Sequence, residues 1–243
     1  VKRHGQELAL WRDSDGKPVI MLDRCPHRSG RLSLGKIKNN RLQCAFHGFE
    51  YDTEGRCQFV PETGKAAEFL KVKTFPSIEK NDLIWLYYGE DNPEDEPPWF
   101  DDLDENFIYS QIVDQWSCHI TRCIESKLDY AHLPYVHPNS IGLDVDVTQK
   151  AHTEMDDIRI KVVPKFKQAS DYCIEFKFPN IIMIQKSEKD RAVIVFAPVE
   201  EKMTILYVRS YYKGLNIPLY KDFVDWSYNS SNQIMLSEIK QIV

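Results

Sequence analysis

Two short Cys/His pairs near the start of the chain constrain its fold more than any other feature. One residue separates Cys25 from His27, and two residues separate Cys44 from His47. Each pair offers one thiolate and one imidazole, so we expect two loops that face each other across a shared metal centre. An iron–sulfur cluster in which two cysteines hold one iron and two histidines hold the other requires this order of ligands.

A structural zinc site is the alternative for these residues. Zinc-binding motifs usually place cysteine next to cysteine and histidine next to histidine. The alternating order in this chain instead favours a Rieske [2Fe-2S] cluster, whose reduction potential is higher than that of an all-cysteine cluster. The ligands would be Cys25, His27, Cys44 and His47.

A second group of polar residues lies further along the chain, between Glu125 and His137. On a continuous helix, Glu125, Asp129 and His132 would share one face. Pro134 would bend or end that helix and could bring His137 back beside His132. Two histidines with one carboxylate form the facial triad of non-heme Fe(II) oxygenases, which leaves coordination positions open for O₂.

Both groups resemble motifs of one family, the Rieske non-heme iron oxygenases. Residues 25–28 and 44–49 resemble its Rieske domain, and residues 129–137 resemble its mononuclear-iron motif. The resemblance implies that His132 and His137 are iron ligands. It also implies that Asp129 links His132 to a cluster histidine of a neighbouring subunit, for which we expect His47.

The third iron ligand departs from the family pattern. Family members usually supply an aspartate from a C-terminal helix, and the matching segment here, residues 236–243, has none. Either Ile239 replaces this aspartate or one residue has been lost before it. Glu238 is the candidate ligand, with Asp222 and Asp225 as weaker alternatives.

The pattern of apolar residues predicts two domains of different class. The first hundred residues alternate short β-like runs with turns, which indicates an antiparallel β domain. Prolines and acidic side chains in residues 90–105 indicate a connection between domains. We expect mostly helix over 116–137, strands within 158–212 and a final helix over 222–243.

We therefore predict an α+β chain: an all-β Rieske domain over 1–105 and an α+β catalytic domain over 106–243. The second domain would have a central antiparallel sheet of the helix-grip type.

Composition excludes several functions. The chain has 31 basic and 37 acidic residues and a net charge of −6, so nucleic-acid binding is not expected. Its apolar runs are shorter than the roughly 18 residues of a membrane span. We expect a cytoplasmic protein whose cysteines outside the cluster are reduced thiols. The chain is also short for the family, so we interpret it as a trimmed sequence.

The function that we predict is that of an oxygenase component. A [2Fe-2S] Rieske cluster and a mononuclear Fe(II) would be its cofactors. No nicotinamide, flavin or Walker A motif is visible, so electrons would come from a separate reductase or ferredoxin. The resemblance favours hydroxylation or demethylation of a small organic substrate by a homotrimer. Cis-dihydroxylation of an aromatic ring is one alternative, an electron-transfer protein with a ligand-binding domain is another, and a zinc-stabilised binding module is a third.

Overall fold

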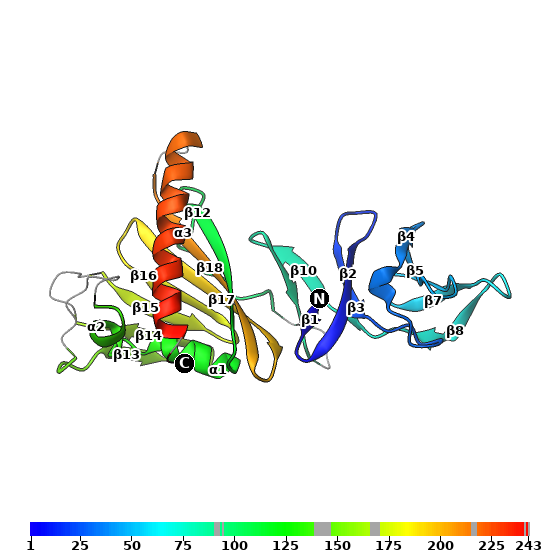
Figure 1. Cartoon of the computed structure of the whole chain (residues 1–243), viewed down its shortest axis with the longest axis horizontal. Coiled ribbons are helices and arrows are strands. Elements are labelled where there is room, and N and C mark those ends of the chain that lie inside the picture. The colour runs from blue at the N-terminus through cyan, green and yellow to red at the C-terminus, as the bar shows by residue number, and fades with distance from the viewer. Residues whose placement is uncertain are drawn as a thin grey trace. The chain divides into compact units, whose positions relative to one another are not determined.

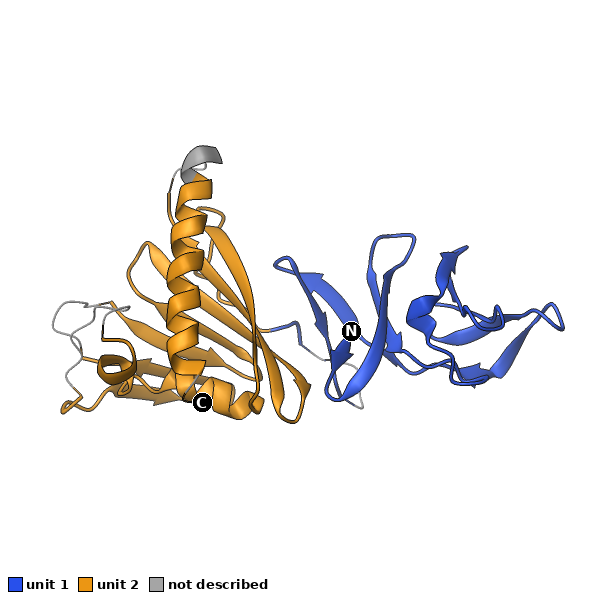
Figure 2. Ribbon diagram, viewed as in Figure 1, with its two compact units in different colours: residues 1–97 blue, residues 98–243 orange. Residues whose placement is uncertain are grey.

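A computed structural model describes residues 1–89, 93, 95–138, 147–165, 171–214, 218–240 and 242. The chain forms two compact units, Val1–Pro97 and Pro98–Val243 (Figure 2). The predicted fold class is confirmed, since an all-β unit precedes an α+β unit with an antiparallel sheet. The units divide between Pro97 and Pro98, whereas the sequence had placed the domain border between residues 105 and 106.

Unit 1 consists of short antiparallel strands in three sheets. The first has the order β1-β2-β3-β9, with bounds Lys2–Arg3, Gln6–Arg12, Pro18–Leu22 and Thr74–Phe75. The second has the order β4-β5-β6-β7-β8, with bounds Lys36–Lys38, Arg41–Gln43, Glu50–Tyr51, Arg56–Val60 and Lys65–Lys71. The third pairs β10 (Ser77–Lys80) with β11 (Leu83–Leu86), and a 3₁₀ turn, η1, covers Leu32–Leu34.

The β2–β3 hairpin shows why this unit folds around the Cys/His pairs. Side chains alternate between the two faces of a strand. Ala9, Trp11 and Met21 point to one side and pack with Cys25 and Cys44 in a single buried cluster. The hairpin therefore forms one side of the buried cluster that contains both cysteines.

Unit 2 is a seven-stranded antiparallel sheet with helices on one face. The strand order is β12-β18-β17-β16-β15-β14-β13. In chain order, the bounds of β12 to β18 are Ile108–Trp116, His152–Met155, Arg159–Val163, Cys173–Lys177, Ile181–Gln185, Asp190–Glu200 and Met203–Tyr212. The helices are α1 (Ile120–Leu128), α2 (Leu133–Val136) and α3 (Pro218–Lys240).

Helix α3 lies across one face of this sheet, and its C-terminal end approaches α1 (Figure 1). Leu236 and Ile239 of α3 are buried and pack in one cluster with Leu206 and Val208 of β18. One turn before Leu236 in α3, the Asn232 amide donates a hydrogen bond to the Ser210 hydroxyl (2.9 Å). These contacts fix the rotation of α3 and thereby decide which of its side chains face the sheet.

The segment after Pro98 belongs to unit 2 because its aromatic and acidic residues contact the sheet. Phe100 is buried, and the Lys177 ammonium lies 5.0 Å from the centre of its ring. Lys177 also donates to the carbonyl of Trp99 (2.8 Å), and Arg191 pairs with Asp102 (3.1 Å). At least one acidic residue of the segment that we expected to connect the domains, Asp102, thus pairs with a basic side chain of the sheet.

Residues 116–137 are mostly helical, as expected, but they do not form one continuous helix. Strand β12 continues to Trp116, α1 ends at Leu128, and α2 begins only at Leu133. Asp129 has an extended backbone (φ −76°, ψ 109°), and its carboxylate accepts a hydrogen bond from the N–H of Ala131 (2.8 Å). Aspartate favours such local turns over continued helix, which explains the break.

Among the helices in the described ranges, none has the length and apolar composition needed to cross a bilayer.

Candidate metal centres

The two Cys/His pairs lie on loops with the same hydrogen-bond pattern. In residues 25–30, the N–H of Cys25 donates to the carbonyl of Gly30, and the N–H of Ser29 donates to the carbonyl of Cys25, both at 2.8 Å. Residues 44–49 repeat both bonds, at 2.8 and 3.0 Å. The fifth residue is left-handed in each loop, Ser29 with φ +56° and Gly48 with φ +76°. The chain thus builds one type of loop twice, and each loop presents a cysteine at its first position.

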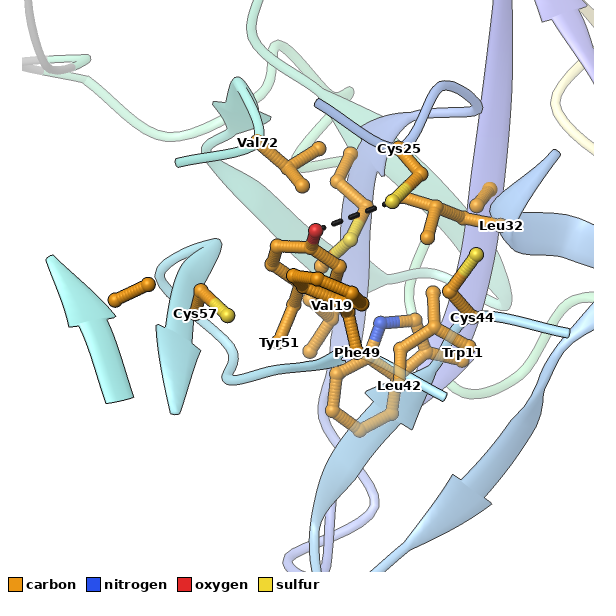
Figure 3. Close-up of a cluster of buried hydrophobic side chains, with 13 residues drawn as sticks. Trp11, Val19, Cys25, Leu32, Leu42, Cys44, Phe49, Tyr51, Cys57 and Val72 are labelled. Atoms are coloured by element: carbon orange, nitrogen blue, oxygen red, sulfur yellow. Dashed lines mark hydrogen bonds between the residues drawn. The ribbon is translucent and has the colours of Figure 1, made fainter. Parts of the chain in front are cut away.

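The four predicted cluster residues are brought together at the tips of these loops. Cys25 and Cys44 are each 2% exposed, and both belong to the buried cluster drawn in Figure 3. The rings of His27 and His47 lie edge to face with their centres 4.8 Å apart. Thiols and imidazoles from both loops therefore converge on one region.

His27 gives a direct test of whether this region fits a metal cluster. Its Nδ1 atom is buried and has no hydrogen-bond partner among the described residues. Buried ring nitrogens are normally satisfied, because leaving one unpaired costs free energy. A metal bound to Nδ1 would remove that cost, so the orphaned nitrogen fits the predicted ligand role of His27.

The sulfur atoms have hydrogen-bond donors around them. The Tyr51 hydroxyl lies 3.1 Å from Cys25 Sγ inside the buried cluster (Figure 3). The backbone N–H groups of Phe46 and His47 point to the Cys44 sulfur. Burial raises the pKa of the Cys44 thiol, and the adjacent Cys25 raises it further. Without a metal the Cys44 thiol would keep its proton, and a bound iron is the group that would remove it.

The second group of predicted residues is assembled by the break between α1 and α2. Asp129 caps the C-terminus of α1, His132 precedes the first residue of α2, and His137 follows its last. Pro134 lies in the first turn of α2, where the missing N–H costs nothing. The rings of His132 and His137 consequently lie 5.4 Å apart, at 66° to each other. The predicted pairing of the histidines is found, although Pro134 begins a helix instead of bending one.

Each of these histidines has a carboxylate at its Nδ1 atom. Asp129 Oδ2 lies 3.6 Å from Nδ1 of His132, and Glu238 Oε2 lies 2.7 Å from Nδ1 of His137. His137 is 3% exposed, while the side chains of Glu238 and Asp129 are 31% and 51% exposed. Burial lowers the pKa of His132, and the Asp129 charge opposes that shift. The cluster thus contains two imidazoles and two carboxylates, which are suitable ligand types for iron.

Glu238 can serve such a site in two ways. As the atoms lie, its carboxylate accepts a hydrogen bond from the Nδ1–H of His137, which fixes the ring and leaves Nε2 as the basic nitrogen. Alternatively, the same carboxylate could itself be a ligand of an ion held by the histidine pair, since carboxylate oxygen and imidazole nitrogen both suit iron. In the described part of the chain, no three His, Cys, Asp or Glu side chains already converge closely enough to enclose an ion.

The remaining candidates lie outside this group. Glu125 is 66% exposed and pairs with Arg122, and the helix that carries it, α1, ends before both histidines. Asp225 accepts a hydrogen bond from the Tyr212 hydroxyl on the sheet (3.1 Å). Tyr51 is the residue that sequence reasoning missed. Its signal, a tyrosine seven positions after Cys44, becomes meaningful only once β6 has folded beside the first loop.

Comparisons with known proteins agree with this geometry. Residues 1–76 match the model of the Rieske [2Fe-2S] domain. The oxygenase component of chloroacetanilide N-alkylformylase from Rhizorhabdus wittichii is 30% identical over 165 residues, which cover 65% of this chain and 47% of that protein. Methylxanthine N1-demethylase NdmA from Pseudomonas putida is 35% identical over 145 residues, covering 58% and 41%.

Solved structures extend the likeness of fold to the whole chain. Dicamba monooxygenase bound to dicamba matches with a TM-score of 0.83 at 23% identity and covers all of this chain and 80% of that one. The NdmA QL mutant with caffeine matches with a TM-score of 0.83 at 26% identity, over 73% of its own chain. This chain spans less than half the length of the two curated relatives.

The loops, the orphaned nitrogen and the matched domain define a Rieske iron–sulfur protein. Within that class, the chain is similar in sequence and fold to the oxygenase components of Rieske systems, and the predicted resemblance is confirmed.

Proposed function

We propose that this chain is the oxygenase component of a Rieske system that hydroxylates or demethylates a small organic substrate. When bound, the cluster would supply single electrons from a reductase or ferredoxin, and a mononuclear Fe(II) would supply the site of O₂ chemistry. The observation that carries the proposal is the pairing of His137 with Glu238, 101 residues apart in sequence, beside His132.

The residues would divide the work between the two centres. Cys25, His27, Cys44 and His47 would hold the cluster, and the Tyr51 hydroxyl would stabilise charge on the Cys25 sulfur. His132, His137 and Glu238 would hold the iron. The buried position of His137 limits the motion of its ring and so keeps it oriented for binding.

Asp129 would connect subunits. One of its carboxylate oxygens accepts from the Ala131 N–H, the other faces His132, and about half of its side chain is exposed. A carboxylate in this position can accept a second imidazole N–H from outside the subunit. We assign that imidazole to His47 of a second copy, in a homotrimeric ring, as the family resemblance implies.

The names of the relatives favour removal of small groups from nitrogen. NdmA is a demethylase and the Rhizorhabdus protein an N-alkylformylase. We therefore place N- or O-demethylation and monooxygenation ahead of cis-dihydroxylation of an aromatic ring. All six cysteines are free in the structure, which supports a reducing compartment such as the cytoplasm.

An electron-transfer protein with a ligand-binding second domain is the second candidate. If Ile239 replaces the family aspartate, that position offers no ligand, because Ile239 is an apolar side chain, 2% exposed within the core.

Iron stoichiometry separates the two functions. The full chain, loaded anaerobically with Fe(II), should carry three irons and two sulfides per chain if both centres form, but only two irons if the cluster is alone. Replacing both His132 and His137 by Ala should lower the ratio from three to two and leave the EPR signal of the cluster unchanged. A wild-type ratio of two after loading would refute the oxygenase proposal. O₂ uptake with a reductase and candidate methylated substrates would then test the reaction.

A further inference from the structure

Two further cysteines, neither of them a predicted metal ligand, meet at the start of α1. Cys118 lies between β12 and α1, and Cys123 lies within α1. Their sulfur atoms are 3.1 Å apart. Cys123 is fully buried, while Cys118 is partly exposed. Both thiols are free, and Cys118 is the less buried of the two.

Their surroundings hold the two sulfurs together. The Thr204 hydroxyl, fully buried on β18, donates a hydrogen bond to the carbonyl of Cys118 (3.1 Å). The ammonium of Lys127, which is 7% exposed, lies 4.7 Å from the centre of the Trp116 ring. Strand β18, the end of β12 and helix α1 thus enclose the pair. A disulfide needs an S–S distance of about 2.05 Å, so the sulfurs must approach by only about 1 Å.

We propose that Cys118 and Cys123 are a dithiol that a peroxide oxidises to a disulfide. The sulfur of Cys118, the less buried residue of the pair, attacks one peroxide oxygen. The O–O bond breaks, and a sulfenic acid and one molecule of water form. The sulfur of Cys123 then attacks the Cys118 sulfur, the S–O bond breaks, and the hydroxide that leaves takes the Cys123 proton as a second water. Two thiols and one hydrogen peroxide therefore give one disulfide and two waters.

The burial of Cys123 decides this order of events. Burial, together with the neighbouring Cys118, raises the pKa of Cys123 to about 12, so Cys123 remains a thiol until its partner has been activated. The disulfide would tether the end of β12 to α1, the helix that Asp129 caps at its other end. The oxidised pair would be reopened by thiol exchange.

Trypsin offers a direct assay, because Arg122 lies between the two cysteines. The thiol pair gives two separate peptides, residues 81–122 and 123–127, whereas the disulfide joins them. The cluster-loaded full chain is treated with one to a few equivalents of hydrogen peroxide, blocked with iodoacetamide and digested without reductant. We expect the joined peptide to appear before the visible absorbance of the cluster falls, and to disappear after dithiothreitol.

Matched variants identify the pair. Cys118→Ser and Cys123→Ala should each abolish the joined peptide, and Cys173→Ser, at a buried cysteine of β15, should leave it unchanged. Cys118→Ser should also protect Cys123 from oxidation. The proposal is overturned if Cys118 is oxidised to sulfinic acid without a link, if neither cysteine reacts while the cluster is being lost, or if the link joins another pair.

Discussion

Removing the Tyr51 hydroxyl should lower the reduction potential of the Rieske cluster. The hydroxyl lies 3.1 Å from Cys25 Sγ, and Tyr51 is fully buried. Burial, reinforced by the Cys25 sulfur, raises the Tyr51 pKa, so this group stays an O–H donor at neutral pH. The hydrogen bond strengthens when the cluster gains an electron, since the sulfurs then carry more negative charge.

The size of the effect follows from the strength of that bond. A hydrogen bond to a charged group is worth about 1.5–3 kcal/mol, and we assign about 1–1.4 kcal/mol of it to the difference between the two redox states. For one electron, about 1.4 kcal/mol corresponds to about 59 mV. Tyr51→Phe should therefore lower the potential by about 40–60 mV, measured by protein-film voltammetry of the cluster-loaded chain.

Tyr88→Phe is the matched control. Tyr88 belongs to the same unit but is 44% exposed and stacks on Phe75, so its variant should keep the wild-type potential. Both variants should retain the circular dichroism of the wild type, because each keeps its ring. If Tyr51→Phe leaves the potential unchanged or raises it while the fold is intact, the hydroxyl does not stabilise the reduced cluster.

Three further predictions concern the second unit. Glu238→Gln should weaken Fe(II) retention in equilibrium dialysis at least about 10-fold, because it removes the charge at His137, whereas Glu125→Gln should not. In Asp114, burial alone raises the pKa, but hydrogen bonds from Lys240 and Trp116 outweigh it and hold the pKa below its usual value. Ionised Asp114 therefore stabilises the fold at pH values above the pKa of this group in the unfolded chain, and the stabilisation is lost as the pH falls through its pKa in the folded chain. Asp114→Asn should lower the free energy of unfolding measured in urea at pH 7, and that free energy should then fall less steeply in acid than it does in the wild type. Asp102→Asn should cost about 1 kcal/mol of unfolding free energy by removing the partner of Arg191, and Asp101→Asn, at an exposed neighbour, should cost less.

Local spacing made the two loops that carry the candidate cluster ligands predictable. Cys25 and His27, like Cys44 and His47, lie on single loops, so their order in the sequence nearly fixes their order in space. Tyr51 reaches Cys25 only through the folding of β6 against the first loop, and no local pattern encodes that contact.

The segment between Trp116 and His137 shows where periodicity misled the prediction. Its spacing fits a helix, but Asp129 makes a turn with the Ala131 N–H and ends α1. Two strands at the sheet edges, β12 and β13, were not predicted. The exposed positions of β13 and the mixed positions of β12 lack the apolar run of a central strand.

Helix α3 explains how a carboxylate reaches His137 although the family aspartate is missing. Side chains one residue apart on a helix differ by about 100° in direction. Ile239 points into the core beside Leu236, so a carboxylate at position 239 would be buried among apolar side chains. Glu238 precedes Ile239 by one residue, and its side chain is partly exposed. A glutamate side chain is longer than that of an aspartate, and its carboxylate reaches Nδ1 of His137. The rotation of α3, set by the Leu236 and Asn232 contacts, therefore selects Glu238 as the residue of this helix that serves the histidine pair.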